Sequence, residues 1–142
     1  MITCTKRLEW DAAHRVLRHE SKCGSLHGHR YSAEIKVSAD QLDHVGRVVD
    51  FGCIKEKVGG WIDAELDHTT IVYSLDKSLL QWCKNEHESL DKHAPFVMKE
   101  ESTAENLAKI ILAKARELLN TDGIFVVSVR VYETPTCWAE AT

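Results

Sequence analysis

One alternating segment is the clearest structural signal in the sequence: residues 27–38 read HGHRYSAEIKVS. Apolar residues from Tyr31 to Val37 alternate with polar ones, which is the period-two pattern of a strand with one buried face. The two histidines that open the segment are two residues apart, so they project from the same face of the strand. The segment therefore predicts a half-buried strand that begins with a pair of imidazoles on one side.

Alternation of the same kind occurs near both ends of the chain. It predicts strands over residues 2–12, 125–133 and 137–141, of which the last is short. In residues 125–133, Phe125, Val127, Val129, Val131 and Glu133 share one parity. We therefore expect all five to face the core.

Helical periodicity fills the middle of the chain. Apolar residues recur three or four positions apart over residues 51–62, 75–90 and 104–118. In the second segment Leu79, Trp82 and Cys83 share a side, and the third begins with capping-box spacing between Ser102 and Glu105. Strands, then helices, then strands predict an α+β fold, with a four-stranded antiparallel sheet that carries its helices on one face.

Composition limits the class of protein. A chain of 142 residues that is 44% hydrophobic can bury one core without disulfides, so we expect a single domain over residues 1–142. The net charge of -4 comes from interspersed signs, which argues against a nucleic-acid partner. Five scattered cysteines without a Cys-x-x-Cys pair suit a reducing cytoplasm, and no apolar run is long enough to span a membrane.

Three histidines form a candidate metal site. His14 has the parity of the apolar residues of the first strand, so antiparallel pairing would bring it to His27 and His29. Three imidazoles can hold Zn²⁺ and leave a fourth position open, which indicates catalysis. A His-x-His pair also occurs as two surface histidines, and His14 alone can be a core or surface residue. The histidines that stand in polar surroundings and are predicted to be solvated are His19, His44, His87 and His93.

Two further groups have chemistry that suits proton transfer. Cys23 lies in a polar loop four residues before His27, where a nearby dication would favour its thiolate; the alternative is a small buried apolar residue. Asp67 and His68 offer a carboxylate beside an imidazole, although the dipole of a helix C-terminus also accounts for a histidine there.

Glu133 is a carboxylate on the predicted inward face of its strand. An unpaired charge on a buried face is costly, so we expect a cation or a group with several hydrogen-bond donors to contact the carboxylate. A planar N–H pair, as on a pterin ring, would satisfy the carboxylate with two hydrogen bonds. The alternative is a residue at the end of the strand that is already in contact with water.

Several segments, in order, resemble the signatures of a known family. They are Trp10–His14, Cys23–His29, Gly46–Phe51, Leu66–His68, Ser102–Ala108 and Val131–Thr134. Together they span most of the chain and are similar to the 6-pyruvoyl-tetrahydropterin synthase and 6-carboxy-tetrahydropterin synthase family. The chain departs from the usual pattern at Trp10, Ser102 and Arg30; at the last of these positions small or amide residues are common.

The resemblance implies a fold, an assembly and a set of site residues. The fold is the tunnelling fold, in which strands of several subunits close into a barrel, usually a homo-hexamer of two trimers with active sites between subunits. The implied roles are zinc ligands for His14, His27 and His29, catalytic base for Cys23, proton relay for Asp67 and His68, and pterin anchor for Glu133, with Thr103 and Glu105 lining the pterin pocket.

The resemblance also implies a reaction on a small pterin. The substrate would be 7,8-dihydroneopterin triphosphate. The short spacing from Cys23 to His27 is similar to that of 6-carboxy-tetrahydropterin synthases, which are lyases that release acetaldehyde and triphosphate on the way to queuosine and related deazapurines. Two alternatives are the pyruvoyl-forming synthase, which eliminates triphosphate without losing acetaldehyde, and a non-catalytic homologue that binds metal or pterin.

Overall fold

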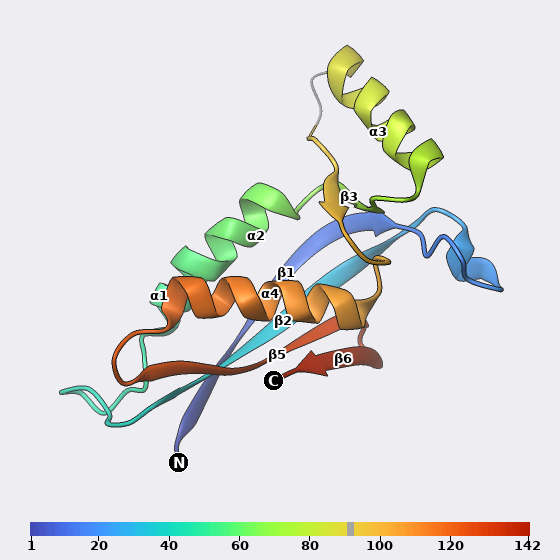
Figure 1. Cartoon of the computed structure of the whole chain (residues 1–142). Helices are drawn as coiled ribbons and strands as arrows, with labels where there is room; N and C mark the ends of the chain where they lie inside the picture. Colours follow the sequence, from blue (N-terminus) through green and yellow to red (C-terminus); the bar gives the residue numbers. More distant parts are fainter. Residues whose placement is uncertain (91–92) are drawn as a thin grey trace.

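The alternating segments form the strands that the sequence predicts. In the computed structural model, which describes residues 1–90 and 93–142, four strands pair antiparallel in succession (Figure 1). They are β1 (Thr3–His14), β2 (His27–Ala39), β5 (Ile124–Thr134) and β6 (Cys137–Ala141). The pairing of β1 with β2 extends from Thr3 opposite Ser38 to His14 opposite His27.

The sheet has six strands in the order β4-β3-β1-β2-β5-β6, so the prediction of a purely antiparallel four-stranded sheet is wrong. Strand β3 (Thr69–Tyr73) pairs parallel with the end of β1, and β4 (Phe96–Met98) pairs parallel with β3. Both are short, and β3 is buried along nearly its whole length, so its sequence does not alternate. Periodicity alone could not reveal these two strands.

Helices cover one face of the sheet, as predicted (Figure 1). The helical layer has two parts. The first is the continuous run of α1 (Phe51–Ile54), the π-helical turn η2 (Lys55–Gly59) and α2 (Gly60–Glu65), and the second is α4 (Ala104–Leu119). They bury Ile54, Val58, Ile62, Leu107 and Ile111 against a sheet face that includes Trp10, Ile35 and Val129. None of the described helices is long and apolar enough to span a lipid bilayer.

The helix α3 (Lys77–Leu90) stands away from this layer and packs near β3. Leu79 and Cys83 are buried against Val72, as their shared side predicts. Trp82, however, is 50% exposed, so its assignment to the same side is wrong. At 100° per residue, Leu79 lies between Trp82 and Cys83 around the helix, so Trp82 is at the edge of the side that packs on β3.

A bulge in β5 corrects the predicted parity of that strand. Lys36 lies opposite Ser128 and Val37 lies opposite Val126, so β5 has one extra residue between these pairs. Before the bulge the inward and outward positions are the reverse of those predicted: Val126 is buried, whereas Phe125 is 44% exposed. After it Val129 and Val131 are fully buried, and the inward parity that they share with Glu133 holds.

The start of α4 differs by one residue from the capping-box prediction. Thr103, not Ser102, caps the helix, since its hydroxyl accepts from the Asn106 N–H at 3.4 Å. The Ser102 side chain turns instead toward β1, where its hydroxyl donates to the Arg15 carbonyl at 3.0 Å. The helix N-terminus is thereby attached to the end of β1.

Candidate metal centre and its cavity

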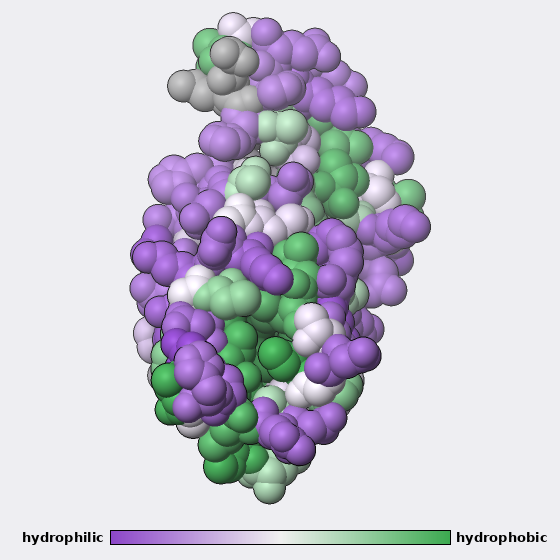
Figure 2. All heavy atoms as spheres, turned by 90° about the vertical axis from the view of Figure 1, so that its left-hand side faces the viewer, coloured by the Kyte–Doolittle hydropathy of each residue, from purple (hydrophilic) through white to green (hydrophobic). Residues whose placement is uncertain are grey.

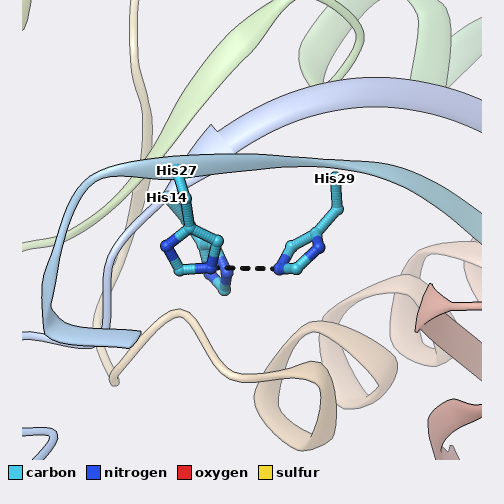
Figure 3. Close-up of side chains that lie close together, drawn as sticks. All are labelled: His14, His27 and His29. Atoms are coloured by element: carbon cyan, nitrogen blue, oxygen red, sulfur yellow. Dashed lines mark hydrogen bonds between the residues drawn. The ribbon is translucent and has the colours of Figure 1, made fainter. Parts of the chain in front are cut away.

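The strand register brings three histidines together on the helix-covered face. His14 is the direct neighbour of His27 across β1 and β2, and His29 lies opposite Ala12 on the same side. One nitrogen of each ring lies within 4.8 Å of the others, and the rings point toward a common centre (Figure 3). The His27 and His29 Nε2 atoms are 3.1 Å apart.

Main-chain carbonyls fix the orientation of two of these rings. His14 Nδ1 lies 2.7 Å from the Ser102 oxygen, and His27 Nδ1 lies 2.6 Å from the Ser25 oxygen. A carbonyl only accepts, so each Nδ1 carries the proton and each Nε2 presents a lone pair to the centre. His14 Nε2 is buried and has no hydrogen-bond partner among the described residues. Such an orphaned acceptor fits a metal ion as its missing partner.

Burial favours the neutral form of His14 and His29, which is the form that binds metal. Desolvation lowers the pKa of His14 to about 4, and the neighbouring His27 and His29 lower it further. The pKa of His29 is also lowered, first by burial and then by His27. Near neutral pH His14 and His29 are therefore neutral nitrogen donors, and a set of three imidazoles suits zinc.

A cavity of about 340 Å³ opens onto the histidines and gathers most of the predicted site residues. Besides the three histidines, its walls include Cys23, Thr103, Glu105 and Glu133. Cys23 comes from the short η1 turn (Lys22–Gly24), and Thr103 and Glu105 come from the start of α4. Segments far apart in sequence thus supply a thiol, carboxylates and a hydroxyl around one candidate metal centre.

The Glu133 carboxylate lies next to the imidazoles of the candidate metal centre. Its carboxylate oxygens are each 3.9 Å from a ring nitrogen, of His14 and of His29 respectively, too far for hydrogen bonds. Burial raises the pKa of Glu133, and the negative charge of Glu105 raises it further. The side chain is 26% exposed, so it remains open to a ligand in the cavity.

Asp67 and His68 lie outside this cavity. They bind each other, with His68 Nδ1 2.9 Å from Asp67 Oδ2, and the His68 side chain is 70% exposed. His68 lines a separate, shallow cavity of about 490 Å³ together with Asp11, Ala13 and Thr69. Within one chain neither residue lines the cavity of the three histidines, although His29 also borders the cavity at His68.

The cavity also has walls that sequence reasoning did not single out. His19, predicted to be solvated, lines it, and so do Cys137 and Trp138 of β6. Tyr31 lies behind the metal centre, with its ring 5.3 Å from that of His29. The parity that Tyr31 shares with His29 predicts that both face the same side. No pattern in the sequence relates β6 or the loop at His19 to this cavity.

Comparisons with known proteins identify the family of the chain and agree with its fold. The family model described as 6-pyruvoyl tetrahydropterin synthase matches residues 3–142. A 6-carboxy-5,6,7,8-tetrahydropterin synthase from Rickettsia bellii is 40% identical over 141 residues, which cover 99% of each chain.

Two solved structures have the same fold. An uncharacterized protein from Wolinella succinogenes has a TM-score of 0.82 at 21% identity, covering 99% of this chain and 97% of the other. The 6-pyruvoyl tetrahydropterin synthase of Caenorhabditis elegans has a TM-score of 0.70 at 22% identity, covering 99% and 94%. With the match over nearly all of its length, this chain belongs to the 6-pyruvoyl tetrahydropterin synthase family.

Proposed function

We propose that this protein is a zinc-dependent 6-carboxy-5,6,7,8-tetrahydropterin synthase. It would convert 7,8-dihydroneopterin triphosphate to 6-carboxytetrahydropterin, acetaldehyde and triphosphate, as a carbon–carbon lyase that supplies queuosine or related deazapurine synthesis. The observation that carries the proposal is the convergence of His14, His27 and His29 on a cavity that also contains a thiol and a carboxylate. The name of the Rickettsia relative favours the carboxy product.

The three histidines would hold the zinc ion through their Nε2 atoms. A bound zinc ion would supply a positive charge that polarises a side-chain oxygen of the substrate and makes the adjacent C–H more acidic. The Ser102 and Ser25 carbonyls keep the rings of His14 and His27 in the tautomer that this requires. Burial of His14 keeps that ring free of a competing proton.

The other residues of the cavity would bind and deprotonate the pterin. Cys23, in its thiolate form, would remove the carbon-bound proton. The Glu133 carboxylate would accept two hydrogen bonds from the N–H groups of the pterin ring, with Thr103 and Glu105 lining the same pocket. The partial burial of Glu133 strengthens such bonds, because water competes less with the ligand.

Assembly would complete the site. Asp67 and His68 do not reach the histidines of their own chain, so we infer that they act as proton relay in the site of a neighbouring copy. The edge of β1 supports pairing with that copy: β3 contacts it only at Ala12–His14, and no strand among the described residues covers the rest. With β6 at the far end of the antiparallel run, copies could join into a closed barrel and a homo-hexamer.

Exposed apolar side chains on the surface could also form contacts between copies. Large hydrophobic side chains that are exposed in the single chain include Leu42, Val45 and Phe51. Figure 2 shows hydrophobic surface between hydrophilic side chains on the side of the molecule that lies at the left in Figure 1. The five cysteines are all free thiols, in keeping with our placement of the protein in a reducing cytoplasm.

Product analysis tests the reaction. The purified protein, with its zinc content measured, is incubated with 7,8-dihydroneopterin triphosphate, and the pterin products and acetaldehyde are quantified. We expect 6-carboxytetrahydropterin and acetaldehyde in equal amounts. A pyruvoyl product without acetaldehyde would establish the alternative synthase, and substrate binding without turnover would establish a non-catalytic homologue.

A further inference from the structure

Arg30 follows the histidine pair in sequence but faces the opposite, uncovered side of the sheet. It lies directly across from Asp11 in the pairing of β1 with β2. One guanidinium nitrogen donates to Asp11 Oδ2 at 2.9 Å, and another lies 3.7 Å from Glu9 Oε2. Arg30 is therefore held to β1 by two carboxylates.

The main chain of Asp11 holds both members of the Asp67–His68 pair. Its N–H donates to Asp67 Oδ1 at 3.0 Å, and its carbonyl oxygen accepts from the His68 N–H at 2.7 Å. His68 has a φ of 57°, in the left-handed region that a side chain other than glycine occupies at a cost of about 1 kcal/mol. These bonds to Asp11 hold the pair in this conformation.

We propose that Arg30 is a positioning residue for the Asp67–His68 pair: it fixes Asp11, to which both members are bonded, and its charge offsets the carboxylates around His68. The inference rests on the proposed function only where it assigns proton transfer to His68.

The charges around His68 make the effect of Arg30 predictable in sign. Asp67 precedes it, β1 contributes Asp11 and Glu9, β2 contributes Arg30 and the His29 that lines the same cavity, and the adjoining β3 residues Thr69 and Thr70 are uncharged. Partial burial opposes ionisation of Asp67, yet its pKa is lowered overall by the Asp11 N–H, by His68 and by Arg30. Arg30 is a cation that contacts both Asp11 and Glu9 of this acidic group.

An NMR titration of the His68 ring tests the proposal without any need for turnover. The resonance is assigned with His68→Asn, and the wild-type protein is compared with Arg30→Gln and Arg30→Lys. Loss of the positive charge should move the midpoint of the His68 titration to higher pH, because a nearby cation disfavours the protonated ring. Arg30→Lys should restore most of the wild-type midpoint, because it keeps the charge.

Arg7→Gln is the matched control. It removes another guanidinium of the same face, which lies 3.8 Å from Glu9 but has no contact with Asp11 in the described structure, and it should leave the midpoint in place. A midpoint in Arg30→Gln that coincides with the wild type would overturn the proposal. So would an equal shift in Arg30→Lys and Arg30→Gln.

The pH–rate profile provides the functional readout. In Arg30→Gln the acid limb should move to higher pH by the same amount as the titration, with unchanged zinc content and melting temperature. Absence of pterin turnover in the wild type would refute the proposed function, whereas the titration would still decide the role of Arg30. A shifted titration with an unshifted profile would refute the link between Arg30 and catalysis.

Discussion

His14 Nδ1 lies 2.7 Å from the main-chain carbonyl oxygen of Ser102, although the two residues are 88 positions apart. This bond connects the end of β1 to the start of α4, and it turns the other nitrogen of the His14 ring toward His27 and His29. The ring is only 1% exposed, so its protonation state is governed by burial rather than by solvent. The properties of the candidate metal centre follow from this arrangement.

Substitution of His27 by alanine should release the metal. The His27 ring supplies one of three nitrogens, and loss of a ligand weakens zinc binding by far more than the roughly 10–100-fold that loss of an outer hydrogen bond costs. Zinc content measured by elemental analysis should fall from one ion per chain to a small fraction. His44→Ala, in an exposed loop, is the control; normal zinc content in His27→Ala would sink the ligand assignment.

Acid should destabilise the metal-free protein through His14. The unfolded chain takes up a proton at His14 near pH 6.5, whereas the folded chain does so only at about pH 4. The unfolded state therefore binds more protons between these values, and the free energy of unfolding falls as pH drops. Between pH 7 and pH 5 this histidine should account for about 2 kcal/mol.

Thermal or denaturant unfolding of the metal-free protein at several pH values measures this effect. In His14→Asn the side chain cannot titrate, so the loss of stability toward pH 5 should be smaller than in the wild type. Identical pH dependence in the two proteins would show that burial does not control His14. Added zinc should raise the stability of the wild type at each pH but should not remove the loss toward acid, because the ion binds only neutral rings whereas the unfolded chain still takes up protons.

Replacement of Cys23 by alanine should abolish turnover and leave zinc bound. Its thiol lines the cavity, but it does not belong to the three-histidine cluster. Loss of a general base typically lowers the rate by about 10²–10⁴-fold. The readouts are product formation and metal content, and Cys53→Ser on α1 serves as control; full activity in Cys23→Ala would exclude the thiol as the base.

Replacement of Glu133 by glutamine should weaken pterin binding. A hydrogen bond to a charged group contributes about 1.5–3 kcal/mol, so KM for the substrate should rise about 10- to 100-fold, with a smaller change in kcat. Glu117→Gln, an exposed glutamate of α4, should leave KM unchanged. Equal KM values for Glu133→Gln and the wild type would mean that the carboxylate does not anchor the ring.

Mixing two inactive variants tests the contribution of a neighbouring copy. Cys23→Ala and His68→Ala chains are dissociated together and allowed to reassemble. If sites form between copies, some sites in the mixture contain both an intact Cys23 and an intact His68, and activity returns. Each variant treated alone is the control, and a mixture that stays inactive despite confirmed mixed oligomers would contradict sites shared between chains.

Much of the fold could be predicted because one buried face imposes a period of two on β1 and β2, and of 3.6 on α4. The prediction failed where that link between face and period was absent. Strand β3 is buried without alternation, β4 has three residues, and the bulge near Val127 shifts the parity of β5. None of these features leaves a periodic pattern in the sequence.

The candidate site divides in a similar way. His27 and His29 could be paired from spacing, and His14 from parity with Trp10, because strand geometry is local and regular. The outer hydrogen bonds to the histidines, and the cavity walls formed by His19 and Trp138, depend on contacts between distant segments. The roles of Asp67 and His68 came from resemblance, and the structure locates them away from the histidines.

The sequence by itself determined which residues alternate, which face β1 and β2 bury, and therefore that three imidazoles would share one side of an antiparallel pair. The tertiary structure alone decided what surrounds them: the Ser102 carbonyl that orients His14, the burial that lowers its pKa, and the Glu133 carboxylate 3.9 Å away. The reason is physical. Periodicity follows from the geometry of a single element, whereas desolvation and hydrogen bonding depend on which elements pack together.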